Sequence, residues 1–498
     1  MMIPKPSEAI HSVVDWYRAT LAAGDIPFWI VFAIAIYTPF EEFLIKWMPS
    51  AIGSLIRFFP EVVLYGLMIQ VLGTRFFKTR NLKATPIDLL LMLFFLSTLI
   101  SMLINGSRLA PSLINMRALC RYLSVFYIVV NINISNGQLK AIVNGIKIAG
   151  LVEAGIASVQ YFLPDGIVAK IFAPRELKIG GFERVSQAES GEIKIGSVFG
   201  TFASPAVLSA FLLLTLVICL VGFFMTPDIF AAKLRALPSM GMILFGLFAS
   251  KKRASWLIAI LLPLVVLYFR RRSKGLAKTI WLYVLLLLIL LGVTSFLGSS
   301  FDTSFAGVEA RERSIDVGSY ILQLFSPSYW QRSSENARGW VVITIVSTLF
   351  KSGSWFGFGP DIENVRNIIY DMLVDGSDRY KILELDPLED TYWFALMAYF
   401  GVIGLGLYIA MIWRLFRAGR WLSKFSPNPE YRRLGTMFCT IVVVTVLYAF
   451  VERIFKFRAF SFYFWMFSGL VVNAYNNRER KETPPPRESM PISSALNS

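Results

Sequence analysis

Long apolar runs recur along the whole chain, and they constrain its fold more than any other feature. Hydrophobic residues make up 55% of the 498 residues, and charged residues only 16%. Backbone polar groups in lipid must be satisfied within helices or a closed barrel, and continuous rather than alternating apolar runs select helices. The sequence therefore predicts an all-α polytopic integral membrane protein and excludes a soluble fold.

A transmembrane helix needs roughly 20 apolar residues to cross a hydrocarbon core of about 30 Å, which predicts about 12 transmembrane helices here. The predicted spans are Pro27–Trp47, Phe59–Phe77, Pro86–Ile104, Leu113–Ile134, Leu139–Phe162, Pro205–Met225, Leu237–Ala249, Ala254–Phe269, Thr279–Leu297, Thr391–Phe416, Leu434–Ile454 and Phe460–Tyr475. We divide the chain into an N-terminal membrane bundle at 1–298 with a periplasmic loop at 164–204, a large periplasmic loop at 299–390, C-terminal spans at 391–476, and a polar, disordered cytoplasmic tail at 477–498.

Basic residues mark the cytoplasmic loops of membrane proteins and so predict the topology. Clusters such as Arg270-Arg271-Arg272 and Arg432-Arg433 follow even-numbered spans, which places both termini in the cytoplasm. The formal net charge of +16 comes from basic residues in short loops between spans. The bilayer is therefore the expected partner, and nucleic acid is not. The three cysteines lie in or beside apolar runs and His11 is the single histidine, so we expect no metal site.

Three consecutive cations, Lys251, Lys252 and Arg253, break the topology rule because they fall on a short tip facing outward. A cation placed deep in a membrane costs up to about 3 kcal/mol on insertion, so a compensating anionic ligand is expected. Arginines bind phosphate and diphosphate through paired hydrogen bonds. The arginines that are candidates to share this ligand are Arg108, Arg117 and Arg121 around the outward end of the fourth span, and Arg332 and Arg338 in the large loop.

Each of these cations has a second interpretation, which is snorkelling to lipid headgroups or pairing with a carboxylate. Arg453 and Arg458, near the last outward turn, are predicted to be ordinary surface charges. Glu389 and Asp390 immediately precede the tenth span, where carboxylates also stabilise a helix N-terminus. The alternative is that Asp390 acts as a general base toward an attacking hydroxyl.

The large loop contains two stretches that favour helices. We expect Ser334 to cap a helix from Glu335 to about Lys351, and Asp361 to cap another that ends near Val374. The first helix is apolar nearly all round, so it should lie buried on the bundle or in the membrane interface. Between the two helices, Gly357-Phe358-Gly359-Pro360 predicts a turn.

Four segments along residues 195–415 resemble motifs of bacterial O-antigen ligases and the related Wzy-type polysaccharide polymerases. Ser250 to Trp256 resembles the S-R-[GA]-x-W motif with two residues between Ser and Arg, and Gly200-Thr201-Phe202 with Pro205 resembles G-T-F-x-x-P. The other two resemblances are Arg338-Gly-Trp340 followed by Gly357-Phe-Gly359-Pro360, as in R-x-x-x-W … G-x-G-P, and Asp390-Thr-Tyr392-Trp393 followed by Gly401-Val-Ile-Gly404, as in H-N-x-Y-L … G-x-x-G.

The resemblance implies glycan transfer from an undecaprenyl-diphosphate donor on the periplasmic face of the bacterial inner membrane, without metal or cofactor. Asp390 stands where the ligases have a histidine, which favours a polymerase. We expect Asp390, Arg338 and Arg253 to be catalytic, and the substrate to be bound by Lys252, Arg332, Arg121, Arg117 and Glu389. A ligase that transfers finished polymer, and a flippase or transporter for the lipid-linked glycan, stay open as alternatives. A separate chain-length regulator stays open as a partner.

Overall fold

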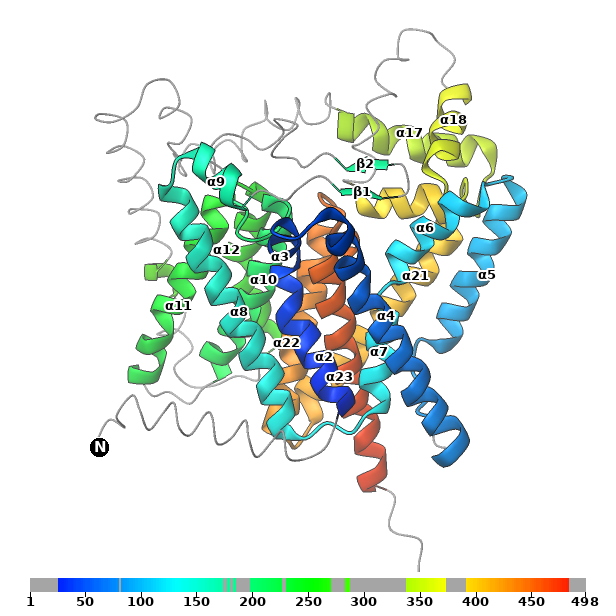
Figure 1. The fold of residues 1–498 in the computed structure, drawn as a ribbon. Coiled ribbons are helices and arrows are strands. Elements are labelled where there is room, and N and C mark those ends of the chain that lie inside the picture. The colour runs from blue at the N-terminus through cyan, green and yellow to red at the C-terminus, as the bar shows by residue number, and fades with distance from the viewer. Residues whose placement is uncertain are drawn as a thin grey trace, which may run out of the picture.

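A computed structural model describes residues 26–79, 82–172, 177–179, 182–184, 198–225, 230–269, 283–286, 337–372 and 391–482 (Figure 1). The first half of these residues forms α2 (Ile26–Tyr37), η1 (Thr38–Phe40), α3 (Glu41–Lys46), α4 (Ser50–Thr74), the π-helical turn η2 (Arg75–Thr79), α5 (Asp88–Ile104), α6 (Leu109–Cys120), α7 (Leu123–Asn131), α8 (Asn136–Phe162) and α9 (Asp165–Phe172). The rest form the antiparallel strands β1 (Leu177–Ile179) and β2 (Phe182–Arg184), then α10 (Pro205–Met225), α11 (Phe230–Ala249), α12 (Arg253–Phe269), α17 (Ala337–Ser352), α18 (Ile362–Met372), α21 (Tyr392–Phe425), α22 (Pro429–Tyr448), η3 (Ile454–Lys456) and α23 (Arg458–Glu482).

The described helices confirm a helical polytopic membrane protein, but not the predicted number of spans. Within the described ranges, six helices are long and apolar enough to cross a membrane, or seven if the bent pair α6 and α7 forms one span. A helix lies in every predicted span, although of Thr279–Leu297 the structure describes only residues 283–286, which are helical. The predicted span Leu113–Ile134 is bent by 41° between α6 and α7, where Tyr122 leaves helical geometry.

Helix α10 lies at the centre of the bundle, in contact with α8, α11, α12, α22 and α23. Its residues are apolar on every side and nearly all are buried, as expected of a helix surrounded by protein. Helices in lipid associate by close packing rather than by hydrophobic burial, so small residues mark their contacts. At the contact of α21 with α22, a Cβ on Gly435 would lie 2.5 Å from the Gly419 carbonyl oxygen, so only glycine allows this approach.

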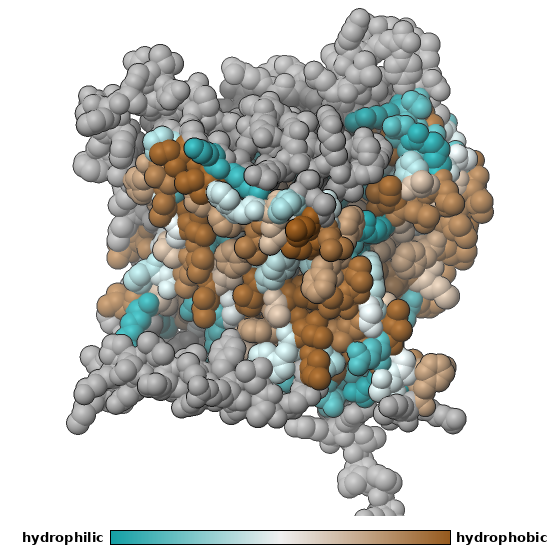
Figure 2. Space-filling model, viewed as in Figure 1, coloured by the Kyte–Doolittle hydropathy of each residue, from teal (hydrophilic) through white to brown (hydrophobic). Residues whose placement is uncertain are grey.

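The outer faces of several helices carry large apolar side chains. Figure 2 shows such side chains gathered in the middle of the molecule, with hydrophilic residues at the upper right over α18. On α4 and α5 the exposed residues include Leu55, Phe59, Leu89 and Leu103. These faces are suited to contact with lipid chains, which agrees with a membrane-embedded bundle.

Both helices predicted in the large loop are present among the described residues. Helix α17 covers Ala337–Ser352, and α18 follows Asp361, whose side chain accepts a hydrogen bond from the Glu363 amide (3.1 Å). Ile345 and Leu349 bury one face of α17, which packs on α21, while Phe350 on another face is exposed. The predicted cap Ser334 lies outside the described residues. Figure 1 places α17 and α18 at the same end of the bundle as α6 and α9.

Candidate functional site

The cationic tip is a tight turn between α11 and α12. Ser250 Oγ donates to the Leu247 carbonyl (2.7 Å), and Trp256 Nε1 donates to the same carbonyl (2.9 Å). Lys251 has a positive φ of 54°, which reverses the chain before α12 begins at Arg253. The predicted division of Leu237–Phe269 into two helices is therefore confirmed. The serine and tryptophan of this motif hold the turn that carries Lys252 and Arg253.

The Gly200-Thr201-Phe202 segment is held by buried side chains of α8. Gln160 accepts hydrogen bonds from the Phe199 and Gly200 amides (3.1 and 2.8 Å) and donates to the Gly200 carbonyl (2.6 Å). Glu153 accepts from the Thr201 amide (3.0 Å). The Val198 amide also donates to the Ala249 carbonyl (3.3 Å), so this segment touches the turn that carries the cations. Two of the segments that resemble family motifs are thus in contact.

The other two motif segments are also in contact, at a break in α21. Gly401 leaves helical geometry with φ 68° and ψ −173°, a conformation essentially limited to glycine. This break frees backbone groups that the Gly357–Pro360 turn uses. The Phe358 and Gly359 amides donate to the Ala398 and Tyr399 carbonyls (2.8 and 3.1 Å). The turn is therefore fixed to α21 by main-chain hydrogen bonds of the kind that join neighbouring strands.

Helix α18 is fastened to the bundle by an ion pair. Arg108, which precedes α6, donates from Nε and Nη2 to the two oxygens of Asp361 (2.7 and 3.0 Å) and also pairs with Glu363 (2.5 Å). Asp361 is fully buried, and the Arg108 guanidinium lowers the pKa of its carboxyl below the ordinary value of 3.8. The charged form of Asp361 therefore holds the loop against the start of α6.

This ion pair predicts that α18 loosens in acid. A carboxyl with a lowered pKa stabilises the folded state above its unfolded pKa, and loses that contribution as the pH falls through its folded pKa. We expect amide hydrogen exchange in 362–372, corrected for the intrinsic rate, to be unaffected by pH above about 5 and to rise below about 4. Asp361→Asn keeps the helix cap but loses the charge. In this variant, amide exchange in 362–372 should be faster than in wild type at neutral pH and should not change with acid. Equal pH responses in both proteins would contradict this assignment.

Seven charged residues form a second group at the same end of the bundle, called here the Glu61 cluster. Its members come from α3, α4, α6, α23 and the residue that follows α6. They are Glu41, Glu42, Arg57, Glu61, Arg117, Arg121 and Arg458. The first predicted span is broken by η1, where Pro39 has no amide proton for a helical hydrogen bond, and the cluster's Glu41 follows directly. Arg117, Arg121 and Arg458 likewise lie at helix ends, whereas Arg57 and Glu61 come from the interior of α4.

Glu61 is the centre of the cluster. One of its oxygens pairs with Arg117 (2.5 Å), and the other lies 3.1 Å from Arg121 and 3.3 Å from Arg458. Arg458 also pairs with Glu41 (2.7 Å). Four arginines face three glutamates, so the cluster carries one positive charge in excess. Arg121 Nε and Glu61 Oε1 are both buried. They are close enough for an ion pair, but neither atom forms a hydrogen bond with the described residues.

The prediction that Arg458 is an ordinary surface charge is wrong. Its side chain is only 13% exposed, and besides its two carboxylate partners it donates to the Arg57 carbonyl (2.6 Å). Sequence reasoning missed Glu41, Glu42, Arg57 and Glu61 altogether. The available signal was that Glu61 stands inside the apolar run Phe59–Phe77, because ionisable residues within membrane spans mark functional or paired sites.

The predicted site residues fall into separate groups. Lys252 pairs with Glu452 (2.9 Å), whereas Arg117 and Arg121 belong to the Glu61 cluster. The short helix η3, which lies between Glu452 and Arg458 in the sequence, contacts α6. The described residues therefore show Lys252, Arg117 and Arg121 paired with carboxylates, which is the second interpretation given above for these cations. Arg338 lies in the first turn of α17 at the same end (Figure 1). Arg332, Glu389 and Asp390 lie outside the described residues.

An apolar groove of about 290 Å³ runs between α21 and α22. Trp393 and Phe450 line the end next to Thr391, where α21 starts, and Ile409 and Ile412 line the part farther along the helix. All of its lining side chains are apolar. A groove of this kind suits a hydrocarbon chain rather than a sugar.

No protein-family model and no curated protein sequence matches this chain. The family resemblance therefore rests on the four segments and on their arrangement. In chemical terms, the described end of the bundle offers guanidinium and ammonium groups that already pair with carboxylates, a loop fastened to α21 by main-chain hydrogen bonds, and an apolar groove suited to a lipid chain.

Proposed function

We propose that the protein polymerises oligosaccharide repeats linked to undecaprenyl diphosphate, on the periplasmic face of the inner membrane, by metal-independent inverting glycosyl transfer. The observation that carries this proposal is that the four motif segments meet in two pairs. The Val198–Ala249 hydrogen bond, between residues that flank the first two motifs, joins one pair, and the Phe358–Ala398 and Gly359–Tyr399 hydrogen bonds join the other. The first pair includes the turn that carries Lys252 and Arg253.

The proposed reaction has one bond-forming and one bond-breaking step at the anomeric carbon. A sugar hydroxyl of one lipid-linked repeat attacks the anomeric carbon of the chain on undecaprenyl diphosphate, and the bond from that carbon to the diphosphate oxygen breaks. Asp390, directly before the α21 cap Thr391, takes the hydroxyl proton. Arg253 and Arg338 stabilise the charge that develops on the leaving diphosphate.

Lipid-linked substrates also need a place for the polyprenyl chain. The groove between α21 and α22 supports the proposal because it begins beside Trp393, within the segment that contains Asp390, and continues along the membrane-spanning part of α21. A lipid lying there would carry its diphosphate toward the start of α21. The turn at Gly357–Pro360, fixed to α21 at the Gly401 break, would hold the loop over that position.

The test is the length distribution of lipid-linked and released glycan in cells from which the gene has been deleted. These cells are compared with the same cells complemented with wild type, Asp390→Ala or Arg338→Ala. We expect the deletion and Asp390→Ala to accumulate single repeats on the outward leaflet. Arg338→Ala should lower polymer yield at least about tenfold, the effect of one charge-assisted hydrogen bond. Arg417→Ala removes an exposed arginine near the other end of α21 and should leave polymer unchanged.

Other outcomes would replace the proposal. If long polymer accumulates on the lipid and only its transfer to the final acceptor fails, the protein is a ligase. Single repeats that remain on the inward leaflet would identify a transporter. Undiminished polymer in Arg338→Ala cells with normal membrane levels of the protein would remove the role assigned to that arginine.

A further inference from the structure

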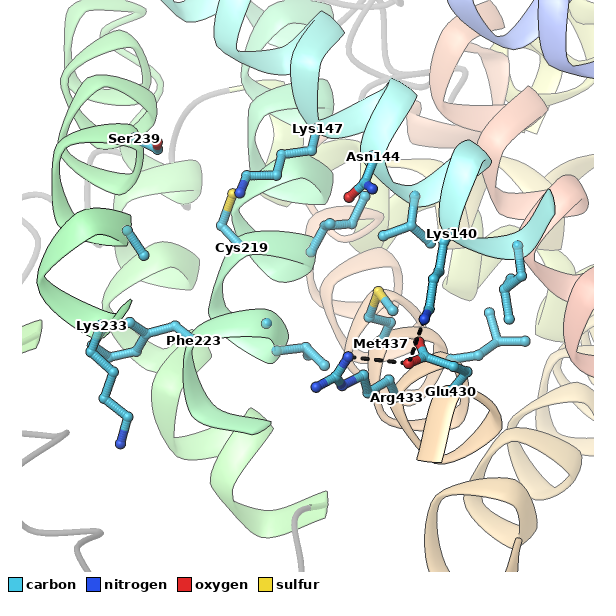
Figure 3. Close-up of a pocket in the computed structure, with 17 residues that line it drawn as sticks. Lys140, Asn144, Lys147, Cys219, Phe223, Lys233, Ser239, Glu430, Arg433 and Met437 are labelled. Carbon is cyan, nitrogen blue, oxygen red and sulfur yellow. Dashed lines mark hydrogen bonds and ion pairs between the residues drawn. The ribbon is translucent and has the colours of Figure 1, made fainter. Parts of the chain in front are cut away.

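A cavity of about 400 Å³ lies at the opposite end of the bundle from the Glu61 cluster, between α8, α10, α11 and α22 (Figure 3). Lys140 and Gln160 both belong to α8, and the rise of an α-helix separates them by about 30 Å along its axis. Gln160 holds the motif segment near the proposed site, whereas Lys140 lines this cavity. The cavity is therefore remote from the proposed reaction.

Four cations line the cavity. Lys140 and Lys147 come from α8, Lys233 from α11 and Arg433 from α22. Figure 3 shows Lys147 reaching across toward Cys219 of α10, and the side chain of Lys233 pointing away from the other labelled side chains. Glu430 is the single carboxylate of the lining, and it lies 3.6 Å from Lys140 and 3.3 Å from Arg433. The charges that face the cavity therefore leave a positive excess.

Lys147 is the most informative of these residues because it lies within the membrane-spanning helix α8. Among the described residues, the ion pairs of this cavity join Glu430 to Lys140 and Arg433, and none includes Lys147. A charged side chain at membrane depth is costly unless it faces a cavity and finds a counterion. Its neighbours in the lining include Val143, Ile218 and Met437, so the cavity joins a basic rim to apolar walls.

We propose that this cavity binds a phosphate group, with Lys147 on one wall and Arg433 on the opposite wall supplying the positive charge that attracts it. Helix α22 begins at Pro429, so its N-terminus adds partial positive charge beside Glu430 and Arg433. Basic pockets between helices, with apolar walls beside them, have the chemistry for the headgroup of an anionic phospholipid. A free phosphate offers the same charge without the acyl chains.

The test uses the purified full-length protein in detergent, titrated separately with phosphatidylglycerol, phosphatidylcholine and inorganic phosphate while the thermal midpoint is followed. We expect phosphatidylglycerol to raise the midpoint and phosphatidylcholine not to. Lys147→Gln should weaken the apparent affinity about tenfold, and Lys147→Arg should retain it. Arg417→Gln removes a cation from α21 at the same end but outside the cavity, and should bind as wild type does.

The outcomes separate the two sources of phosphate. Protection by inorganic phosphate that depends on Lys147 would assign the site to a soluble phosphate compound, and protection by phosphatidylglycerol alone would assign it to lipid. Responses that are the same in wild type and Lys147→Gln would overturn the proposal. Arg433→Gln alters the opposite wall and supplies a second variant if Lys147→Gln does not fold. Because the readout is binding, the result is independent of glycan synthesis.

Discussion

Replacing Glu61 with glutamine is expected to lower the free energy of unfolding by about 3 to 5 kcal/mol, because it leaves buried guanidinium groups without their counterion. Glu61 is 3% exposed and lies within ion-pair distance of Arg117, Arg121 and Arg458. Glutamine has nearly the same shape, so the change removes charge and little packing. Denaturation of the purified protein in detergent measures the loss.

Two control variants make this prediction specific to burial. Glu363 also pairs with an arginine, Arg108, but its side chain is 54% exposed, and Glu363→Gln should leave stability nearly unchanged because water screens exposed pairs. Arg117→Gln removes the most exposed arginine that contacts Glu61, and should cost less than Glu61→Gln because Arg121 and Arg458 keep their partner. Similar losses in Glu61→Gln and Glu363→Gln would show that the cluster is open to water.

Periodic and local signals made much of the fold predictable. Uninterrupted apolar runs indicated where helices lie, as in Pro205–Met225, whose bounds α10 matches. The capping residue Asp361 indicated the start of α18. Lengths were less predictable. The helices Asp88–Ile104 and Arg253–Phe269 are apolar but shorter than the six candidate spans, and the predicted span Leu113–Ile134 is bent at Tyr122.

The candidate site was only partly predictable because ion pairs depend on distances between helices. Arg117 and Arg121 were expected to face a diphosphate, yet the nearest anion is Glu61 from another helix. Local sequence shows which residues carry charge but not which partner a helix contact supplies. Nothing near Arg458 in the sequence indicates its pairing with Glu41 on the first predicted span. The roles of Asp390, Glu389 and Arg332 stay predictions.

Replacing Gly401 with alanine is expected to detach the Gly357–Pro360 turn from α21. A Cβ at this position would lie 2.0 Å from the Trp355 carbonyl oxygen, and the φ of 68° with ψ of −173° is unfavourable for any other residue. Backbone strain and overpacking together should cost about 3 kcal/mol. Relief of that strain requires α21 or the turn to move, so the Phe358–Ala398 and Gly359–Tyr399 hydrogen bonds should be lost.

Gly406→Ala is the matched control, since it makes the same change in the same helix. An added Cβ there meets nothing within 4 Å, and alanine in a helix interior is about 1 kcal/mol more favourable than glycine. Hydrogen exchange in 355–372 should therefore rise sharply in Gly401→Ala and stay unchanged in Gly406→Ala. Under the proposed function, polymer synthesis should fall only in the first variant. If the turn stays fully protected in Gly401→Ala, α21 can regain a continuous helix without releasing the loop. The break at Gly401 would then have no part in positioning the site.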